Sequence, residues 1–123
     1  MSDTIFFTDV AMIVCVVDAG NADTILLAAQ EMGARNAIVS YARGWGTRER
    51  LGALGVAVET EKEVVSIIVS SEQQDLMFDG LYRAGRFDLP GRGYIGILPL
   101  DKAASYVPKA VRERLEIGGG EET

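Results

Sequence analysis

The sequence predicts an α+β domain in which two helices cover one face of a four-stranded antiparallel sheet. Three observations predict it: short runs rich in valine and isoleucine, two segments with apolar residues at helical spacing, and glycine-rich turns between them. In chain order these segments form a βαββαβ pattern, the ferredoxin-like split βαβ arrangement. The 123 residues suffice for one such domain with a single hydrophobic core.

The first strand and the first helix have the clearest patterns. Residues 11–19 are apolar except for Asp18, which favours a buried strand. Residues 20–34 follow as a helix, with Asn21 as the N-cap and Gly33 closing the C-terminus. The apolar residues at helical spacing are Ala22, Ile25, Leu26, Ala29 and Met32.

A long connection separates the next two strands, which we expect at 36–42 and 63–70. About twenty residues lie between them, including four glycines, whereas a hairpin turn needs only about 2–5. Long connections within a compact domain are usually functional or disordered. We therefore expect a loop with a role in binding or signalling.

The second helix and the fourth strand complete the pattern. Ser71 and Gln74 have capping-box spacing and predict a helix that ends at Gly85. This helix passes through Leu76, Met77, Leu81 and Ala84. A glycine-rich turn at 84–93 then leads into a strand at 93–100.

The domain boundaries follow from these elements. Residues 1–9 are an N-terminal extension, 10–115 form the domain, and 116–123 are a disordered C-terminal tail because GGGEET lacks core-forming residues. Residues 101–115 fit either a short strand or a helix at the edge of the sheet.

Composition excludes several classes of function. A net charge of -6 and a pI near 4.6 argue against nonspecific nucleic-acid binding. No membrane-spanning run or secretory signal is visible, so we expect a cytoplasmic protein. Without histidine, acid–base catalysis by imidazole is impossible, and no metal site is predicted. The single Cys15 is expected in the core rather than as a reactive thiol.

Acidic residues surround Lys62 near the end of the long connection. These are Glu59, Glu61 and Glu63. They are either solvated loop charges or carboxylates that bind a cation.

Two glycine turns carry arginine in this acidic chain. YARGWGTRER at 41–50 holds three of the twelve basic residues, and AGRFDLPGRG at 84–93 holds two more. Consecutive glycine N–H groups can form a concave anion site, and a guanidinium binds phosphate oxygens in pairs. No Walker motif is present. The turns predict a local site for a small anion, in which Trp45 either packs the loop or stacks on a ligand.

The chain resembles the PII signalling superfamily over roughly residues 10–108. RGWGT is similar to the Gly-aromatic-Gly step that opens the T-loop of that family, and AGRFDLPGRGYI is similar to its B-loop. VETEKEVVSIIV resembles the segment where the T-loop rejoins the third strand. The resemblance implies a PII-like homotrimer whose inter-subunit clefts bind ATP, ADP or AMP, with the T-loop reporting the ligand to a target protein.

The resemblance also implies site residues. The nucleotide-binding set is Gly44, Gly46, Thr47, Gly85, Arg86, Gly91, Arg92 and Gly93. The partner-binding loop contains Trp45, Arg48, Arg50, Leu51 and Leu54. No catalytic residue and no cofactor is expected, so the chain is interpreted as a regulator and not an enzyme.

Departures from the family pattern narrow the range of ligands that the resemblance implies. The loop tip RERLGALGVAVE has no tyrosine for uridylylation and no serine for phosphorylation, and Asp88, Leu89 and Pro90 enlarge the B-loop. Only Lys102 provides a cation in place of the arginine-rich C-loop. These differences argue against 2-oxoglutarate sensing. They favour a divergent sensor that accompanies a transporter or an inorganic-carbon system and responds to bicarbonate with an adenine nucleotide.

Two other classes of function share the predicted fold. One is a trimeric binding protein without nucleotide, similar to divalent-cation tolerance proteins. The other is a small phosphate-handling enzyme of the acylphosphatase type, although no phosphate-cradling loop follows the first strand.

Overall fold

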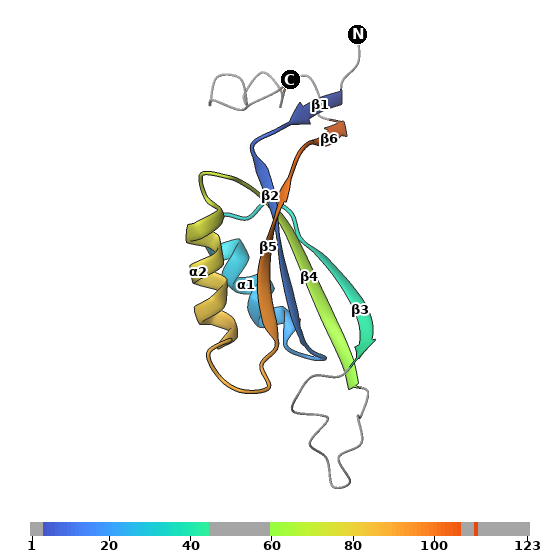
Figure 1. Cartoon of the computed structure of the whole chain (residues 1–123), viewed down its shortest axis with the longest axis vertical. Coiled ribbons are helices and arrows are strands. Elements are labelled where there is room, and N and C mark those ends of the chain that lie inside the picture. The colour runs from blue at the N-terminus through green and yellow to red at the C-terminus, as the bar shows by residue number, and fades with distance from the viewer. Residues whose placement is uncertain (1–3, 45–59, 107–109, 111–123) are drawn as a thin grey trace, which may run out of the picture.

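The computed structural model describes residues 4–44, 60–106 and 110. The elements are β1 (Thr4–Phe7), β2 (Val10–Asp18), α1 (Ala22–Glu31), β3 (Ile38–Gly44), β4 (Thr60–Ser70), α2 (Gln74–Gly85), β5 (Tyr94–Leu100) and β6 (Ala103–Tyr106). Strands β3-β4-β2-β5 form an antiparallel sheet in that order, and both helices lie on one side of it (Figure 1). The predicted βαββαβ core is confirmed, with boundaries that differ by at most three residues.

The hydrophobic core lies between the sheet and the two helices. Alternate residues of β2 and β4 face the helices because side chains along a strand point to opposite faces. The largest fully buried side chains are Ile13, Cys15, Ile25, Val65, Ile67 and Leu81. Burial raises the pKa of the Cys15 thiol to about 12. This confirms Cys15 as a core residue that stays protonated and unreactive at neutral pH.

Helix α1 begins after Asn21, as predicted, but Asn21 does not cap it. The Asn21 side chain makes no capping hydrogen bond, and its backbone is helical. Instead, the Gly20 and Ala22 backbone N–H groups donate to Oε1 of Glu63 on β4, at 2.7 and 3.1 Å. A carboxylate from a distant strand thus accepts from the first N–H group of the helix and from Gly20 just before it, and it stabilises the positive end of the helix dipole.

Glu63→Ala is expected to lower the free energy of unfolding by about 1–2 kcal/mol because it leaves both N–H groups without this acceptor. Glu63→Gln, which keeps an oxygen acceptor, should cost less. Urea denaturation at fixed protein concentration measures both effects. Glu72→Ala, at an exposed position before α2, is the control, and equal losses at positions 63 and 72 would contradict the capping role.

Helix α2 begins later than its sequence pattern suggested. The predicted capping box of Ser71 and Gln74 is wrong: Gln73 is the N-cap residue and makes no side-chain capping bond. Ser71 instead lies in a turn, where its backbone N–H donates to the Asp9 carbonyl at 2.9 Å. With this start the buried face is Met77, Leu81 and Gly85, four residues apart, whereas Leu76 is exposed.

A second sheet, of two strands, pairs a segment near the N-terminus with a segment that follows β5. Strand β1 pairs antiparallel with β6, with Ile5 opposite Ser105, and this ribbon continues from the end of the main sheet (Figure 1). The N-terminal extension therefore contains a strand that we did not predict, while the strand alternative for residues after 101 is confirmed for β6. Lys102 lies at the turn into β6, with Nζ 5.6 Å from the centroid of the Phe6 ring.

The face of the sheet opposite the helices is open and apolar. Met12, Val14 and Val16 on β2 point to this face, alternating with the core residues of the strand. Their apolar cross-strand neighbours are Val64 and Ile68 on β4 and Tyr94 and Leu98 on β5. Three of these neighbours, Ile68, Tyr94 and Leu98, are exposed in the single chain. A contiguous apolar face of this kind is typical of a surface covered by another molecule.

Within the described residues, neither helix has the length and apolar character needed to cross a membrane.

Candidate functional site at one end of the sheet

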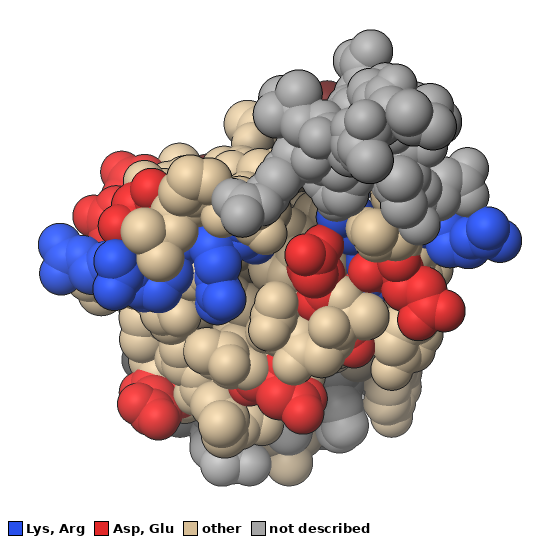
Figure 2. Space-filling model, turned by 90° about the horizontal axis from the view of Figure 1, so that it is seen from below, with Lys and Arg blue, Asp and Glu red and all other residues tan. Residues whose placement is uncertain are grey.

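The described members of the predicted nucleotide-binding set, Gly44 and five residues between 85 and 93, lie at one end of the sheet. The strand register places Asp18, the last residue of β2, opposite Lys62 near the start of β4, and Gly44 opposite Thr60. The loop from α2 to β5 reaches the same end (Figure 1). Seen from this end, basic side chains lie at both sides of the molecule with acidic side chains between them (Figure 2).

The α2–β5 loop is a tight structure with three residues at positive φ. Arg86 ends the helix in the left-handed conformation, with φ 53° and ψ 46°, and Gly91 and Gly93 have φ of 78° and 103°. Phe87 anchors the loop because it packs against the core, with its ring 6.2 Å from that of Tyr82. The predicted B-loop is thus an ordered turn whose backbone is bent where two of its glycines occur.

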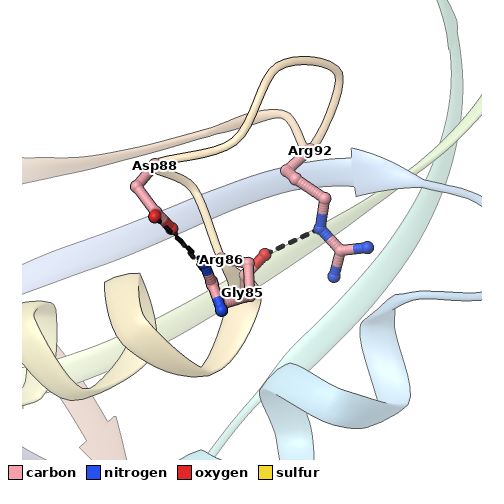
Figure 3. A network of polar contacts seen from close by, with 4 residues as sticks. All are labelled: Gly85, Arg86, Asp88 and Arg92. Carbon is pink, nitrogen blue, oxygen red and sulfur yellow. Dashed lines mark hydrogen bonds and ion pairs between the residues drawn. The ribbon is translucent and has the colours of Figure 1, made fainter.

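The side chain of Arg92 is held in place by a hydrogen bond from Nε, which leaves its two terminal nitrogens for other partners. Its Nε donates to the Gly85 carbonyl at 3.0 Å, which satisfies a carbonyl at the C-terminus of α2 (Figure 3). Among the described residues no other polar partner is found for Arg92, and its two terminal nitrogens point away from Gly85. A guanidinium held in this way is oriented in advance to donate to an anion.

Arg86 has a different environment from Arg92. Its Nε and one terminal nitrogen donate to the two carboxylate oxygens of Asp88, at 3.1 and 3.2 Å (Figure 3). The hydrogen bond to Asp88 raises the pKa of Arg86, and the same bond to Arg86 lowers the pKa of Asp88. Asp88 is therefore a carboxylate at neutral pH and already occupies the guanidinium of Arg86.

The glycines predicted to contact a nucleotide differ in whether the local structure requires glycine at their positions. A Cβ at Gly85 would meet Phe87 and Ile25 at 2.5 and 2.9 Å, so Gly85 is required for packing beneath the loop. Gly44 does not have a positive φ, and a Cβ there would meet nothing within 4 Å. Nothing within one chain therefore requires glycine at position 44.

The structure brings together only part of the predicted nucleotide site. The residues of the α2–β5 loop, Gly85, Arg86, Gly91, Arg92 and Gly93, lie beside edge strand β5. Gly44 ends the opposite edge strand, β3, in the order β3-β4-β2-β5. Three strand spacings separate these edges, about 14 Å at the usual spacing of ~4.8 Å. One chain therefore does not hold Gly44 and the loop arginines around one small ligand.

The remaining predicted residues lie outside the described residues. These are Gly46 and Thr47 of the nucleotide set, and Trp45, Arg48, Arg50, Leu51 and Leu54 of the partner-binding loop. Their roles stay predictions.

The acidic residues around Lys62 that the structure describes do not form a single cluster of carboxylates. Glu63 caps α1, and Lys62 Nζ is 2.6 Å from Oδ1 of Asp18 across the β2–β4 pair. Glu59 lies outside the described residues. Among the described residues, no group of three potential metal ligands is found. The Glu63 carboxylate already accepts hydrogen bonds from the backbone of Gly20 and Ala22, which argues against Glu63 as a cation ligand.

Lys102, the one cation predicted for the C-loop, lies at the other end of β5 from Arg92. Seven residues of β5 separate the two positions, about 23 Å at ~3.3 Å per residue. Within one chain, Lys102 and the loop arginines therefore cannot contact the same phosphate group.

Sequence reasoning missed two residues that shape this end of the molecule. Asp88 was regarded only as part of an enlarged turn, although the spacing Arg86-x-Asp88 next to a helix end was a visible signal for a local ion pair. Glu63 was considered only as a loop charge or a cation ligand, and its contact with α1 joins residues 41 positions apart in the sequence. No local signal predicts a contact of that range.

Comparisons with known proteins place this arrangement in a known fold. No protein-family model matches the sequence, and no significant match is found among curated proteins. Among solved structures, the crystal structure of PII from Arabidopsis thaliana bound to citrate matches with a TM-score of 0.60 and 19% sequence identity. The match covers 77% of this chain and 78% of the Arabidopsis chain.

The fold defines the chain as an α+β protein of the ferredoxin-like βαββαβ class. More particularly, it has the PII fold, and the resemblance to the PII superfamily is confirmed at the level of the fold.

Proposed function

We propose that this protein is a PII-like signal-transduction protein. Three copies associate through their open sheet faces, and an adenine nucleotide, ATP, ADP or AMP, binds between neighbouring copies. The observation that carries the proposal is the α2–β5 loop, in which Arg92 is pre-oriented beside Gly91 and Gly93 with its terminal nitrogens available. The PII fold supports the same function.

The division of the site between two sheet edges supports a cleft between subunits. The loop arginines and Gly44 lie at the same end of the sheet but at opposite edges. When identical copies associate around a symmetry axis, one edge of a copy approaches the other edge of its neighbour. Each cleft then combines the arginine loop of one chain with the β3 end of the next.

The proposal extends to a regulatory role for the connection between β3 and β4. A nucleotide bound beside Gly44 contacts the start of this loop, so ligand binding shifts the loop between states that a target protein distinguishes. Bicarbonate is proposed as a second effector and a membrane transporter or an enzyme of inorganic-carbon or nitrogen metabolism as the target. The protein acts in the cytoplasm and catalyses no reaction.

Calorimetric titration of the full chain with ATP, ADP and AMP, each with and without bicarbonate and 2-oxoglutarate, tests the proposed function. We expect saturable binding of at least one adenine nucleotide, enhanced by bicarbonate and unaffected by 2-oxoglutarate. GTP controls for binding of phosphate groups alone. Absence of binding by all three adenine nucleotides at millimolar concentration would refute the proposal.

Assembly is tested by placing a charge on the open face. Leu98→Glu, at a position 50% exposed in the single chain, is expected to convert a trimer to monomers because a carboxylate would be buried between copies. Leu27→Glu, at a position 60% exposed on α1, is the control and should leave the trimer intact. Light scattering measures the mass of each variant. A wild-type monomer at micromolar concentration would contradict the proposed cleft.

A further inference from the structure

The two arginines of the α2–β5 loop are in opposite states. Arg92 uses one nitrogen on the Gly85 carbonyl and keeps its terminal nitrogens without another partner among the described residues. Arg86 uses one side of its guanidinium on both oxygens of Asp88. Arg92 is therefore available to an anion, whereas Arg86 is already paired with the carboxylate of Asp88.

The contact between Arg86 and Asp88 has the form that a phosphate contact would take. Two nearly parallel N–H groups meet two oxygens of one anionic group, the paired geometry that guanidinium uses for carboxylate and phosphate alike. The loop itself holds the partners together, because the Leu89 N–H donates to the Arg86 carbonyl at 3.0 Å and closes a turn around Asp88. Asp88 thus imitates a bound anion.

The pair is also exchangeable. The side chains of Arg86 and Asp88 are 58% and 47% exposed, so water reaches both groups. Exposed ion pairs contribute little to stability. An incoming phosphate can therefore displace Asp88 from Arg86 without disturbing the core contacts of Phe87.

We propose that Asp88 is a specificity-determining residue that competes with the ligand phosphates for Arg86. This inference rests on the proposed function, because it names a residue that limits affinity at the same site. When a phosphate binds, Asp88 must release Arg86, and its carboxylate then lies close to the new negative charge. The penalty increases with the charge of the ligand, so Asp88 weakens ATP binding more than AMP binding.

Asp88→Asn is the direct test, with AMP, ADP and ATP as probes in calorimetry. The asparagine keeps the size of the side chain and removes its charge. We expect tighter binding of all three, by about twofold for AMP and about five- to tenfold for ATP. Asp101→Asn removes the same charge from an exposed turn after β5, at the far end of the sheet. This control should change each affinity by less than about twofold.

A second variant distinguishes competition for Arg86 from a general electrostatic effect of the Asp88 charge. In Arg86→Gln the partner of Asp88 is absent, so only its repulsion of the phosphates remains, and adding Asp88→Asn should tighten ATP binding by less than it does in the wild-type background. An equal gain in both backgrounds would overturn the proposal. Thermal unfolding of each variant verifies that the loop change leaves the fold intact.

The outcomes distinguish the inference from the function on which it rests. If wild-type protein binds ATP and Asp88→Asn binds it equally or more weakly, Asp88 only shapes the loop and this inference is overturned, while the proposed function stands. Equal gains in Asp88→Asn and Asp101→Asn would also overturn it, because net charge alone would explain them. If neither the wild type nor any variant binds an adenine nucleotide, the proposed function fails and the inference fails with it.

Discussion

Gly93→Ala is expected to lower the free energy of unfolding by about 2–4 kcal/mol. Gly93 has φ of 103°, a conformation that side chains resist, and a Cβ there would overlap the backbone carbonyl oxygen of Val16. Val16 pairs with Tyr94 in the β2–β5 ladder, so its carbonyl cannot move without disturbing the sheet. Urea denaturation at one fixed protein concentration measures the loss.

Gly33→Ala is the matched control for this substitution. Gly33 has a similar φ of 92°, but a Cβ there would meet nothing within 4 Å. It should show only the cost of the dihedral angle, about 1–2 kcal/mol. If both variants lost the same stability, the close approach of Gly93 to β2 would contribute nothing.

The elements with a strong local pattern could be predicted from the sequence. The largely apolar segment at 11–19 corresponds to β2, and the helical spacing from Ala22 to Ala29 corresponds to the buried face of α1. Strand β1 could not be predicted in the same way. Its four residues are too short for a clear period, and its partner β6 lies about a hundred residues later. Pairing over such a distance leaves no local signal.

The candidate site shows the same division between local and distant information. Arg92 and the glycines beside it were predicted because arginine and glycine in one turn suit an anion. The hydrogen bond from Arg92 to Gly85 was not predicted, since it depends on the left-handed end of α2, and the pair of Arg86 with Asp88 was missed although the two residues are only two positions apart. The position of Gly44 on the opposite sheet edge required the strand order. Residue type thus indicated the chemistry of the loop, and only the fold showed that its arginines and Gly44 lie at opposite edges of the sheet.

Arg92→Ala is expected to weaken binding of an adenine nucleotide about ten- to a hundredfold, or about 1.5–3 kcal/mol. The substitution removes the pre-oriented terminal nitrogens and the bond that holds the side chain to Gly85. Arg92→Lys keeps a charge, but a single ammonium group lacks the planar set of donors that serves both partners. It should recover only part of the affinity in calorimetry with ATP or ADP.

Two controls distinguish a direct contact from a diffuse positive field. Arg83→Ala removes an exposed charge from the last turn of α2, close to the same loop, and Arg50→Ala removes a charge from residues 45–59, which lie outside the described residues. Both should change affinity by less than about threefold, because neither is expected to contact the phosphates directly and solvent-exposed charges are screened by salt. Arg92→Ala also leaves the Gly85 carbonyl without its donor, so its stability must be measured separately and should fall by about 1 kcal/mol. Equal losses of affinity at positions 50, 83 and 92 would mean that the arginines act only through their net charge and that Arg92 holds no phosphate.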